Sequence, residues 1–407
     1  MKKTIRDLGE INGKRVLVRA DFNVPLDEAG NITGDARILA TLPTLKYLVA
    51  QGAKVIVMSH LGRPKGQVNE SLRMTGVAKR LSELLAPVSV TKLDDVVSPA
   101  VTAAVDAMQP GEIVLLENVR FEPGETKNDP SFAKALDNLA DIYVNDAFGA
   151  AHRAHASTEG VAKLAPIGVA GLLMEKEIQA LDSVLHHPQK PFTAIVGGSK
   201  VSSKITVLRQ LLDKVNNLVI GGAMIFTFLK AQGYAVGTSM VEEDYVEVAA
   251  KLMEEAAQQD VCITLAKDVI VADKFDAEAQ TQCVPVEEMP DGWMGLDVGP
   301  ETIERVQQLI HNSKTILWNG PMGVFEFPKF AAGTRAVADN IAEWSEKGHC
   351  KSVLGGGDTV TAIETFGIPH EKYTHVSTGG GASLEYLEGV ELPGIAVLDE
   401  QNHVVQV

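Results

Sequence analysis

The chain has 407 residues, 45% of them hydrophobic and 22% charged, with a formal net charge of −16. This length predicts two domains, because a single hydrophobic core rarely grows beyond about 250–300 residues. The acidic balance argues against a nucleic-acid partner, and no apolar run approaches the roughly 18 residues of a membrane span.

The remaining composition favours a cytoplasmic location. The three cysteines, Cys262, Cys283 and Cys350, are far apart and show no zinc-binding spacing, which suits a reducing compartment. The first residues include lysines but no apolar segment typical of a secretion signal. We therefore expect a cytoplasmic protein with neither a membrane nor a nucleic-acid partner.

The charge is divided unevenly along the chain. Residues 1–170 contain 20 Lys and Arg against 20 Asp and Glu, whereas residues 171–407 contain 17 against 33. This asymmetry indicates two halves with different roles. The acidic half could still bind a nucleotide if a divalent cation is bound together with the nucleotide. A solvated acidic surface, however, explains much of the excess of Asp and Glu.

The first half alternates short apolar runs with helical patterns. We predict buried strands at 15–18, 54–58, 113–116 and 141–144, and helices at 38–49, 71–86 and 131–139. The second helix would begin at a capping serine, Ser71. Strands that alternate with helices predict a parallel sheet, and parallel sheets bind ligands at the carboxyl ends of their strands.

Arginines follow all four predicted strands of this half. They lie in the segments 19–25, 59–64, 117–121 and 145–157, and Arg37 opens the first helix. A single loop arginine is usually solvated or in a surface ion pair. Because four strand ends share one edge of the sheet, and arginine captures carboxylate and phosphate groups in a bidentate manner, we predict a site for a small, multiply anionic ligand there.

A long helical pattern over 172–185 is interpreted as the link between the halves, with an ordinary core helix as the alternative. Beyond it we predict strands at 192–196, 218–220, 262–265, 315–318 and 351–354, each followed by loop residues. Glycines gather in these loops, at 197–198, 221–222, 320–323, 355–357 and 379–381. Glycine loops at strand ends let backbone N–H groups approach phosphates closely.

The segment 195–204 is the strongest phosphate candidate of the second half. A strand and two glycines precede Lys200 and Lys204, which would lie on one face of the helix expected there. The segment matches neither the Walker A nor the dinucleotide pattern, so a simple turn with surface lysines is the alternative. Asp358 opens a helical pattern as either a cap or a Mg²⁺ ligand; Trp318 and Met322 are expected in the core.

Eight segments in order carry a family resemblance. They are 19–25 (RADFNVP), 59–64 (SHLGRP), 117–121 (ENVRF), 146–153 (DAFGAAHR), 196–201 (VGGSKV), 318–326 (WNGPMGVFE), 355–359 (GGGDT) and 377–382 (STGGGA). From about residue 4 to about residue 400 the chain resembles phosphoglycerate kinases of the bacterial type. The resemblance implies two Rossmann-like, three-layer α/β/α lobes with parallel sheets, joined by a long helix and a hinge.

The resemblance also implies domains and site residues. Residues 1–170 would bind 3-phosphoglycerate, with about 388–407 packing back on them, and 171–387 would bind the Mg²⁺-nucleotide. The implied glycerate-binding residues are Asp21, Phe22, Asn23, Arg37, His60, Leu61, Gly62, Arg63, Arg120 and Arg153. The implied nucleotide-binding residues are Gly198, Lys200, Lys204, Gly222, Gly295, Asn319, Glu326, Gly356, Gly357, Asp358 and Thr359.

Particular roles follow from the same resemblance. Arg37, Lys200 and Gly380 would be catalytic, Glu326 would bind the ribose hydroxyls, and Asp358 would bind the Mg²⁺ that accompanies ATP or ADP. Lys200 would meet the transferred phosphoryl group and Lys204 the nucleotide phosphates. Ser199 and Ala223 depart from the residues frequent in the family, alanine and glycine respectively, without removing a charge.

The implied reaction is direct, in-line transfer between 1,3-bisphosphoglycerate and ADP, giving 3-phosphoglycerate and ATP in glycolysis, in a monomer whose cleft closes. The acceptor carboxylate is already ionised, so no general base is needed. A nucleotide-dependent dehydrogenase is disfavoured by the missing G-x-G-x-x-G motif. A two-lobed, non-catalytic protein that binds small anions or nucleotides is the other alternative.

Overall fold

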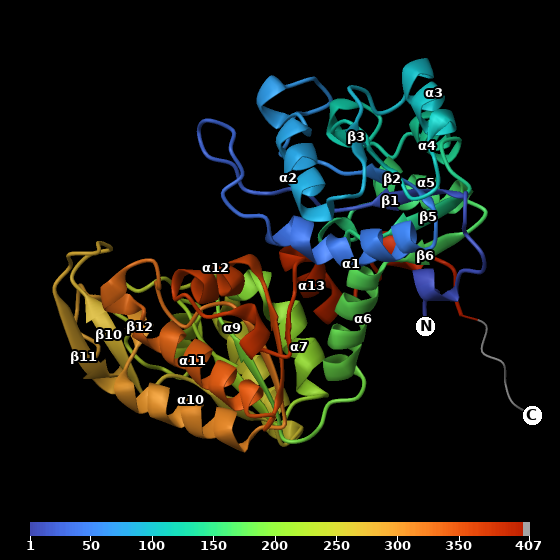
Figure 1. The fold of residues 1–407 in the computed structure, drawn as a ribbon. Coiled ribbons are helices and arrows are strands. Elements are labelled where there is room, and N and C mark those ends of the chain that lie inside the picture. Colours follow the sequence, from blue (N-terminus) through green and yellow to red (C-terminus); the bar gives the residue numbers. More distant parts are fainter. Residues whose placement is uncertain (402–407) are drawn as a thin grey trace, which may run out of the picture. The chain divides into compact units, whose positions relative to one another are not determined.

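The computed structural model describes residues 1–401 and divides into two units (Figure 1). One unit comprises residues 1–179 together with the C-terminal segment from Glu391, and the other comprises Ala180–Val390. The boundaries predicted from the sequence are at 170 and 387. The last part of the returning segment, 402–407, lies outside the described residues.

A six-stranded parallel sheet forms the centre of the first unit, with the strand order β3-β4-β2-β1-β5-β6. Its strands are β1 (Arg15–Arg19), β2 (Lys54–Met58), β3 (Val90–Lys92), β4 (Ile113–Leu115), β5 (Ile142–Asn145) and β6 (Gly168–Ala170). The four strands predicted for this half are β1, β2, β4 and β5. Since β4, β2, β1 and β5 are consecutive neighbours, their carboxyl ends form one continuous edge.

Helices cover both faces of this sheet (Figure 1). They are α1 (Ala36–Ala50), α2 (Thr75–Leu85), α3 (Pro99–Ala107), α4 (Pro130–Asp137) and α5 (Val161–Leu164). In α1, Ile38, Leu42, Leu45 and Leu48 recur at helical spacing and are buried against alternate strand residues such as Val55. Buried residues recur about every 3.6 positions along the helix and every second position along the strands. The two buried faces pack together and form the core between the helices and the sheet.

The predicted cap at Ser71 is wrong. Ser71 lies in a short 3₁₀ turn, η2 (Glu70–Leu72), and α2 begins only at Thr75. At the start of α2, the N–H of Met74 donates to the buried carboxylate of Glu117, 2.9 Å away. A partner distant in sequence therefore replaces the local serine cap. The short strands β3 and β6 and the helix α3 were not predicted either.

The returning C-terminal segment packs on the N-terminus of the chain. The N–H of Lys3 donates to the carbonyl oxygen of Asp399 at 2.7 Å, and the ammonium group of Lys2 donates to that of Ala396 at 2.8 Å. The side-chain amide of Asn145, at the end of β5, donates to Gly394 at 2.8 Å. Residues 391–401, which include α14 (Pro393–Ala396), are thus bonded to the first unit.

The helix predicted over 172–185 is α6 (Leu172–Leu185), which starts in the first unit and ends in the second. Its first N–H groups bond to acceptors of the first unit. Leu172 donates to the hydroxyl of Thr44 at 2.9 Å, and Leu173 and Met174 donate to the buried carboxylate of Asp146 at 2.9 and 3.2 Å. Asp146 therefore anchors α6 to the end of β5.

The second unit contains another six-stranded parallel sheet, in the order β15-β14-β13-β7-β8-β9. Its strands are β7 (Phe192–Val196), β8 (Asn217–Ile220), β9 (Cys262–Thr264), β13 (Thr315–Asn319), β14 (Lys351–Gly355) and β15 (His375–Val376). All five strands predicted for this half belong to it, and only the two-residue β15 was missed.

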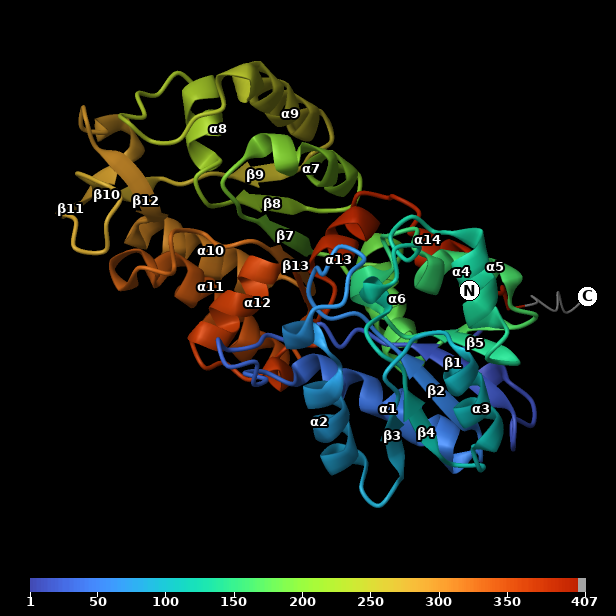
Figure 2. The same cartoon turned by 90° about the horizontal axis from the view of Figure 1, so that it is seen from above.

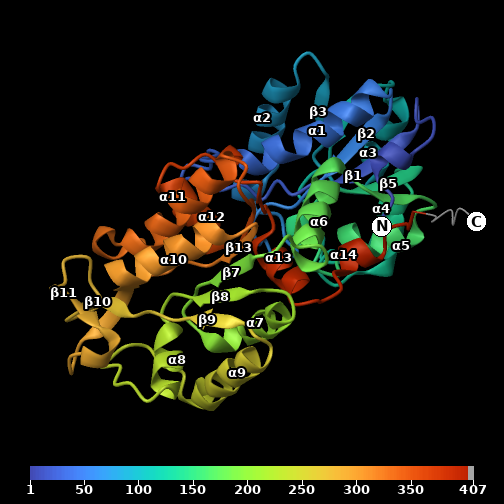
Figure 3. The ribbon, with the colours of Figure 1, turned by 90° about the horizontal axis from the view of Figure 1, so that it is seen from below.

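Two layers of helices enclose this second sheet. Figures 2 and 3 show α7, α8 and α9 on one face and α10, α11 and α12 on the other. The helices of the unit are α7 (Ile205–Leu212), α8 (Ile225–Ala231), α9 (Val246–Gln258), α10 (Pro300–Asn312), α11 (Ala332–Glu346), α12 (Gly357–Thr365) and α13 (Gly380–Leu387). Each unit is therefore a three-layer α/β/α arrangement around a parallel sheet, as predicted.

An antiparallel sheet, which the sequence analysis did not predict, extends the second unit. It has the order β11-β10-β12 and consists of β10 (Asp268–Ala272), β11 (Thr281–Pro285) and β12 (Met294–Val298). Beside it lies a small core of Ala272, Ala279, Leu296 and Phe330. Pairing of these strands depends on residues far apart in sequence, which local patterns do not reveal.

Candidate functional site

The carboxyl edge of the first sheet brings three predicted ligand residues together. Asp21 follows β1, His60 follows β2, and Arg37 is the second residue of α1. The guanidinium group of Arg37 donates to the Asp21 carboxylate, and His60 Nδ1 lies 3.9 Å from the other Asp21 oxygen. Asp21 thus holds Arg37 beside the histidine at this edge.

Hydrogen bonds between the strand-end loops fix the neighbouring backbone. The N–H of Gly62 donates to Asn23 Oδ1 at 2.8 Å, and Arg120 Nη1 donates to the carbonyl oxygen of Gly62 at 2.9 Å. The N–H of Phe22 donates to the Ser59 hydroxyl at 2.8 Å, while that of Leu61 donates to Asn118 Oδ1 at 3.2 Å. Predicted residues of three loops therefore form one bonded group.

Arg63, in the loop after β2, and Arg153, in the segment after β5, are exposed. Within residues 1–401, no side-chain hydrogen bond or ion pair joins either of them to the other predicted anion-site residues. Their charges nevertheless act on neighbouring groups. Burial is the main cause of the lowered pKa of Arg120, and the charge of Arg63 lowers it further. In the same way, the charge of Arg153 adds to the effect of burial on the pKa of His155. Both guanidinium groups are thus available to a ligand.

A buried arginine that the sequence analysis left without a role lies behind this edge. Arg19 is fully buried; its Nε donates to the Ser157 hydroxyl at 2.8 Å, and its Nη2 lies 3.1 Å from His60 Nδ1. Ser157 in turn donates to the buried Glu125 carboxylate at 2.6 Å. The position of Arg19 at a strand end was visible in the sequence, but its burial was not.

Burial and neighbouring charges set the protonation states here. Burial, together with the guanidinium of Arg19, holds the pKa of His60 well below its usual value despite the opposing effect of Asp21. Burial likewise lowers the pKa of His155 to about 4. Both imidazoles are therefore neutral at pH 7. Although burial opposes it, the pKa of Asp21 is lowered, and with His60 neutral we attribute this to Arg37 and Arg19.

One donor at this edge is left over. Arg120 Nε is buried and has no hydrogen-bond partner among the described residues. An unpaired buried donor costs free energy comparable to a lost hydrogen bond. Together with the exposed Arg63 and Arg153, it fits an anionic ligand that supplies several acceptor oxygens.

In the second unit, glycines allow three strand-end loops to touch through their backbones. A Cβ atom on Gly197, after β7, would lie 1.9 Å from the carbonyl oxygen of Pro321, after β13. Gly222, after β8, has a φ of +71°, and a Cβ atom there would lie 2.4 Å from the carbonyl oxygen of Gly198. Side chains are excluded at these positions, so the backbone itself forms the surface.

The prediction that Lys200 and Lys204 lie on one helical face is wrong. Between them is a 3₁₀ turn, η6 (Val201–Ser203), and α7 begins only at Ile205. The Ser203 hydroxyl donates to the carbonyl oxygen of Lys200 at 2.8 Å, a local bond that competes with helix formation. The lysines consequently differ: Lys200 is exposed, whereas Lys204 is partly buried and donates to Asn319 Oδ1.

Asn319 and Thr359 hold the loop after β13. The hydroxyl of Thr359, which is fully buried, accepts a hydrogen bond from the N–H of Gly320 at 2.7 Å. Asn319 Nδ2 is buried without a partner in the described part of the chain, and Gly356, with a φ of +95°, lies against it. Asn319 can therefore offer one amide donor to a ligand. Trp318 is in the core, as expected.

A cavity of about 840 Å³ lies beside these loops. Among the predicted residues, it is lined by Gly198, Gly222, Gly295, Glu326 and Asp358. A Cβ atom on Gly295 would lie 2.0 Å from the ring of Phe226, so this glycine keeps the cavity open. Most of the apolar lining, including Phe226, Met240 and Phe275, was not predicted from the sequence, whereas Met322, expected in the core, is buried and also lines the cavity.

Asp358 is an exposed residue in the first turn of α12 and makes no capping bond, because Gly356 occupies the N-cap position. No group of three or more His, Cys, Asp or Glu side chains suited to a metal ion occurs among residues 1–401. One carboxylate beside glycine loops still fits Mg²⁺, which in nucleotide sites is held by one or two carboxylates plus phosphate oxygens. Gly380, at the start of α13, lies against the backbone of Gly357.

These two sites define a class of protein. A cationic edge on one α/β unit, and a glycine-lined cavity that includes the carboxylate of Asp358 on another, are what a nucleotide-dependent phosphotransferase requires. A model of the family described as phosphoglycerate kinase matches residues 5–390 of the chain. The chain belongs to the phosphoglycerate kinase family.

Individual relatives agree with this assignment. A phosphoglycerate kinase of Acaryochloris marina is 58% identical over 98% of this chain and 99% of its own length. A chloroplastic phosphoglycerate kinase of Volvox carteri is 57% identical over 98% and 87%, respectively. The predictions of the family and of a phosphotransferase with a carboxyl acceptor are confirmed.

Solved structures support the fold. A phosphoglycerate kinase from Coxiella burnetii matches with a TM-score of 0.88 and 41% identity over 98% of both chains. One from Pyrococcus horikoshii matches with a TM-score of 0.81 and 32% identity over 98% of both chains. The predicted fold class is confirmed. No helix within residues 1–401 has the length and apolar character needed to cross a membrane.

Proposed function

We propose that this chain transfers a phosphoryl group reversibly between 1,3-bisphosphoglycerate and ADP, forming 3-phosphoglycerate and ATP in glycolysis. The observation that carries the proposal is the family match over residues 5–390, in a chain that retains both a cationic strand edge and a glycine-lined cavity. A non-catalytic binding protein has no observation in its favour.

We assign 3-phosphoglycerate to the first unit. Arg63 and Arg153 are exposed, and Arg120 has a free Nε donor, so these arginines would bind the phosphate and carboxylate groups. His60, which is neutral, would form a hydrogen bond with 3-phosphoglycerate and would not contribute a positive charge. Asp21 would orient Arg37, to which it is bonded, while Asn23 would hold the Gly62 loop.

We assign the nucleotide to the cavity of the second unit. Its apolar wall suits a base, and the exposed carboxylate of Glu326 at its lining suits ribose hydroxyls. The glycines near Lys204 and Asn319 would bring backbone N–H groups to the phosphates. Asp358 would hold Mg²⁺, which when bound neutralises phosphate charge.

The proposed chemistry rests on positioning and charge. Because the acceptor is a carboxylate, no side chain has to remove a proton. Lys200, which is exposed and outside any ion pair in the described chain, and Arg37 would stabilise the negative charge of the phosphoryl group during direct in-line transfer, with backbone N–H groups near Gly380 as further donors. We also propose a closing movement, since water would otherwise hydrolyse the acyl phosphate.

We further propose a cytoplasmic monomer. The scattered cysteines suit a reducing compartment, although the Volvox relative is named as chloroplastic. Size-exclusion chromatography with light scattering tests the monomer.

The decisive experiment is a coupled assay of ATP consumption with purified protein, Mg²⁺ and 3-phosphoglycerate. We expect turnover that requires all three components. Binding of 3-phosphoglycerate and ADP without turnover would contradict the proposal and would support the non-catalytic alternative.

A further inference from the structure

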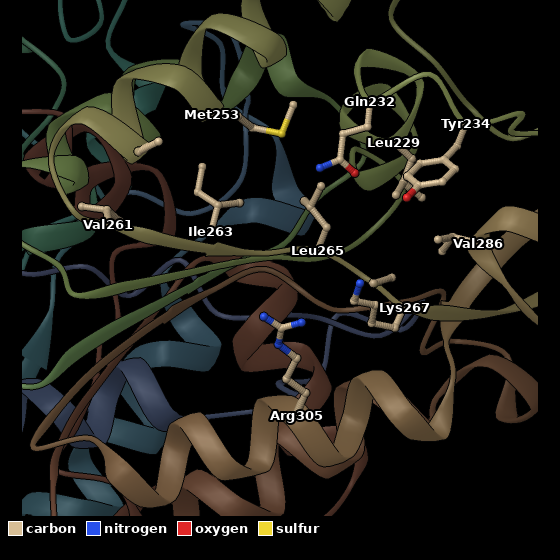
Figure 4. Close-up of a pocket in the computed structure, with 12 residues that line it drawn as sticks. Leu229, Gln232, Tyr234, Met253, Val261, Ile263, Leu265, Lys267, Val286 and Arg305 are labelled. Carbon is tan, nitrogen blue, oxygen red and sulfur yellow. The ribbon is translucent and has the colours of Figure 1, made fainter.

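A second cavity of the second unit, of about 330 Å³, contains none of the residues predicted for substrate binding. Figure 4 shows its lining side chains, which come from α8, α9, β9, α10 and the segments that follow α8, α9, β9 and β11. Its volume is near the lower end of the range of small-molecule sites, about 300–1,000 Å³.

Two cationic side chains reach this cavity from different elements. Lys267 precedes β10, and Arg305 extends from α10 toward the side of the cavity where Lys267 and Leu265 lie (Figure 4). Within residues 1–401 neither side chain is in an ion pair or a side-chain hydrogen bond. In a half of the chain that carries 33 acidic and 17 basic residues, two cations without acidic partners at one cavity indicate an anionic ligand.

The rest of the lining is mainly apolar. Leu229, Val261 and Val286 are buried, whereas Met253, Ile263 and Leu265 are partly exposed, and Figure 4 shows several of these side chains on the side away from Arg305. Gln232 and Tyr234 add polar groups. A strongly hydrated polyanion would leave this apolar surface without a partner, whereas an apolar group would remove it from water.

We propose that this cavity binds a small carboxylate with an apolar body. The guanidinium group of Arg305 and the ammonium group of Lys267 would bind the carboxylate, since arginine forms bidentate bonds to that group. The body of the ligand would lie against Met253, Ile263 and Leu265. The site is separate from the nucleotide cavity, but both are lined from α8 or its end: Phe226 lines the nucleotide cavity and Leu229 this one.

Methionine methyl groups can report on the two cavities separately. Met253 lines the second cavity, while Met240, Met294 and Met322 line the nucleotide cavity. In full-length protein labelled with ¹³C at the methionine methyl groups, we expect hexanoate to shift the Met253 signal saturably, with a dissociation constant on the order of 1 mM. Signals of the nucleotide-cavity methionines should respond to ADP instead.

Uncharged 1-hexanol tests the role of the carboxylate. It should shift the Met253 signal with roughly tenfold weaker affinity than hexanoate, because the charge-assisted bonds are absent. Equal affinities would overturn the assignment of an anion. No saturable Met253 shift up to about 20 mM hexanoate would overturn the site itself, because such binding would be too weak to be specific.

Variants test the two cations. The double variant Lys267→Gln and Arg305→Gln should bind hexanoate roughly tenfold more weakly while binding 1-hexanol unchanged. Lys251→Gln is the matched control, since Lys251 is an exposed residue of α9 that pairs with Glu247 and does not line the cavity. Unchanged hexanoate affinity in the double variant would overturn the proposal. No measurement depends on catalysis, so failure here is distinct from failure of the proposed kinase activity.

Discussion

The ammonium group of Lys204, in the segment after β7, donates a hydrogen bond to Oδ1 of Asn319, the last residue of β13. Burial lowers the pKa of Lys204, and the charges of Asp358 and Glu388 oppose that effect. The same asparagine retains a buried Nδ2 without a partner in the described chain. The pair thus orients a lysine while leaving one amide donor for a ligand.

Asn319→Ala should weaken ADP binding. The change removes the acceptor of a partly buried ammonium group and the free amide donor, so we expect a loss of affinity of roughly tenfold or more. Titration calorimetry with ADP and Mg²⁺ measures it. Asn312→Ala, at an exposed residue of α10, should leave the affinity unchanged; equal affinities in both variants would contradict the role of Asn319.

Lys200→Ala should lower turnover by roughly 10²–10³-fold, because a charge that meets the phosphoryl group in the transition state is lost. The affinity for 3-phosphoglycerate should be nearly unchanged. Steady-state kinetics and equilibrium binding separate the two effects. Lys251→Ala, at the exposed Lys251–Glu247 pair, is the control, and near-normal turnover of Lys200→Ala would remove Lys200 from the chemistry.

Arg63→Ala should weaken 3-phosphoglycerate binding by roughly tenfold, since an exposed guanidinium group available to the ligand is removed. ADP affinity should not change. Calorimetric titration with each ligand gives both values. Arg6→Ala, which affects only the surface pair with Glu175, serves as the reference; a normal 3-phosphoglycerate affinity in Arg63→Ala would exclude Arg63 from the site.

Gly222→Ala should abolish or strongly weaken ADP binding. The substituted residue would have both a strained φ, costing about 1–3 kcal/mol, and a Cβ atom 2.4 Å from the carbonyl oxygen of Gly198. Gly233→Ala separates these effects, because Gly233 has a φ of +92° but nothing within 4 Å of the added Cβ. We expect Gly233→Ala to lose stability but keep ADP affinity; the prediction fails if both variants bind ADP normally.

Asp146→Asn should make the protein more stable at neutral pH. Burial raises the pKa of Asp146 to about 6 from 3.8, so the folded state holds this proton more tightly than the unfolded state. The proton on Asp146 therefore contributes roughly 3 kcal/mol to the free energy of unfolding. This contribution is fully present below the pKa that Asp146 has in the unfolded chain, and it is lost as the pH rises through about 6. An asparagine oxygen can still accept from Leu173 and Met174, without that loss.

Calorimetric unfolding at pH 4 to 8 measures this effect. The difference in stability between Asp146→Asn and the parent protein should grow as the pH rises from 4 to about 7 and then remain constant. The control is Asp106→Asn, since Asp106 is an exposed residue of α3. A difference that does not vary with pH would contradict the assignment of a raised pKa to Asp146.

The alternation of strands and helices, and the chemistry at the strand ends, follow from local features of the sequence. Patterns such as Lys54–Met58 and Phe192–Val196 are local, because side-chain periodicity and burial follow from neighbouring residues. Arginines after the strands of the first half and glycines after those of the second are also local features. Together they indicated an anion site and a phosphate site before any contact was known.

The bonding partners of these residues, in contrast, depend on the folded arrangement of distant segments. Arg19 is buried behind His60, and Ser157, far away in sequence, accepts a hydrogen bond from it there. Lys200 and Lys204 are separated by a 3₁₀ turn, and Lys204 is directed to Asn319. The bonds of Arg19 to Ser157 and of Lys204 to Asn319 join residues more than a hundred positions apart, so their geometry could not be obtained from spacing along the chain.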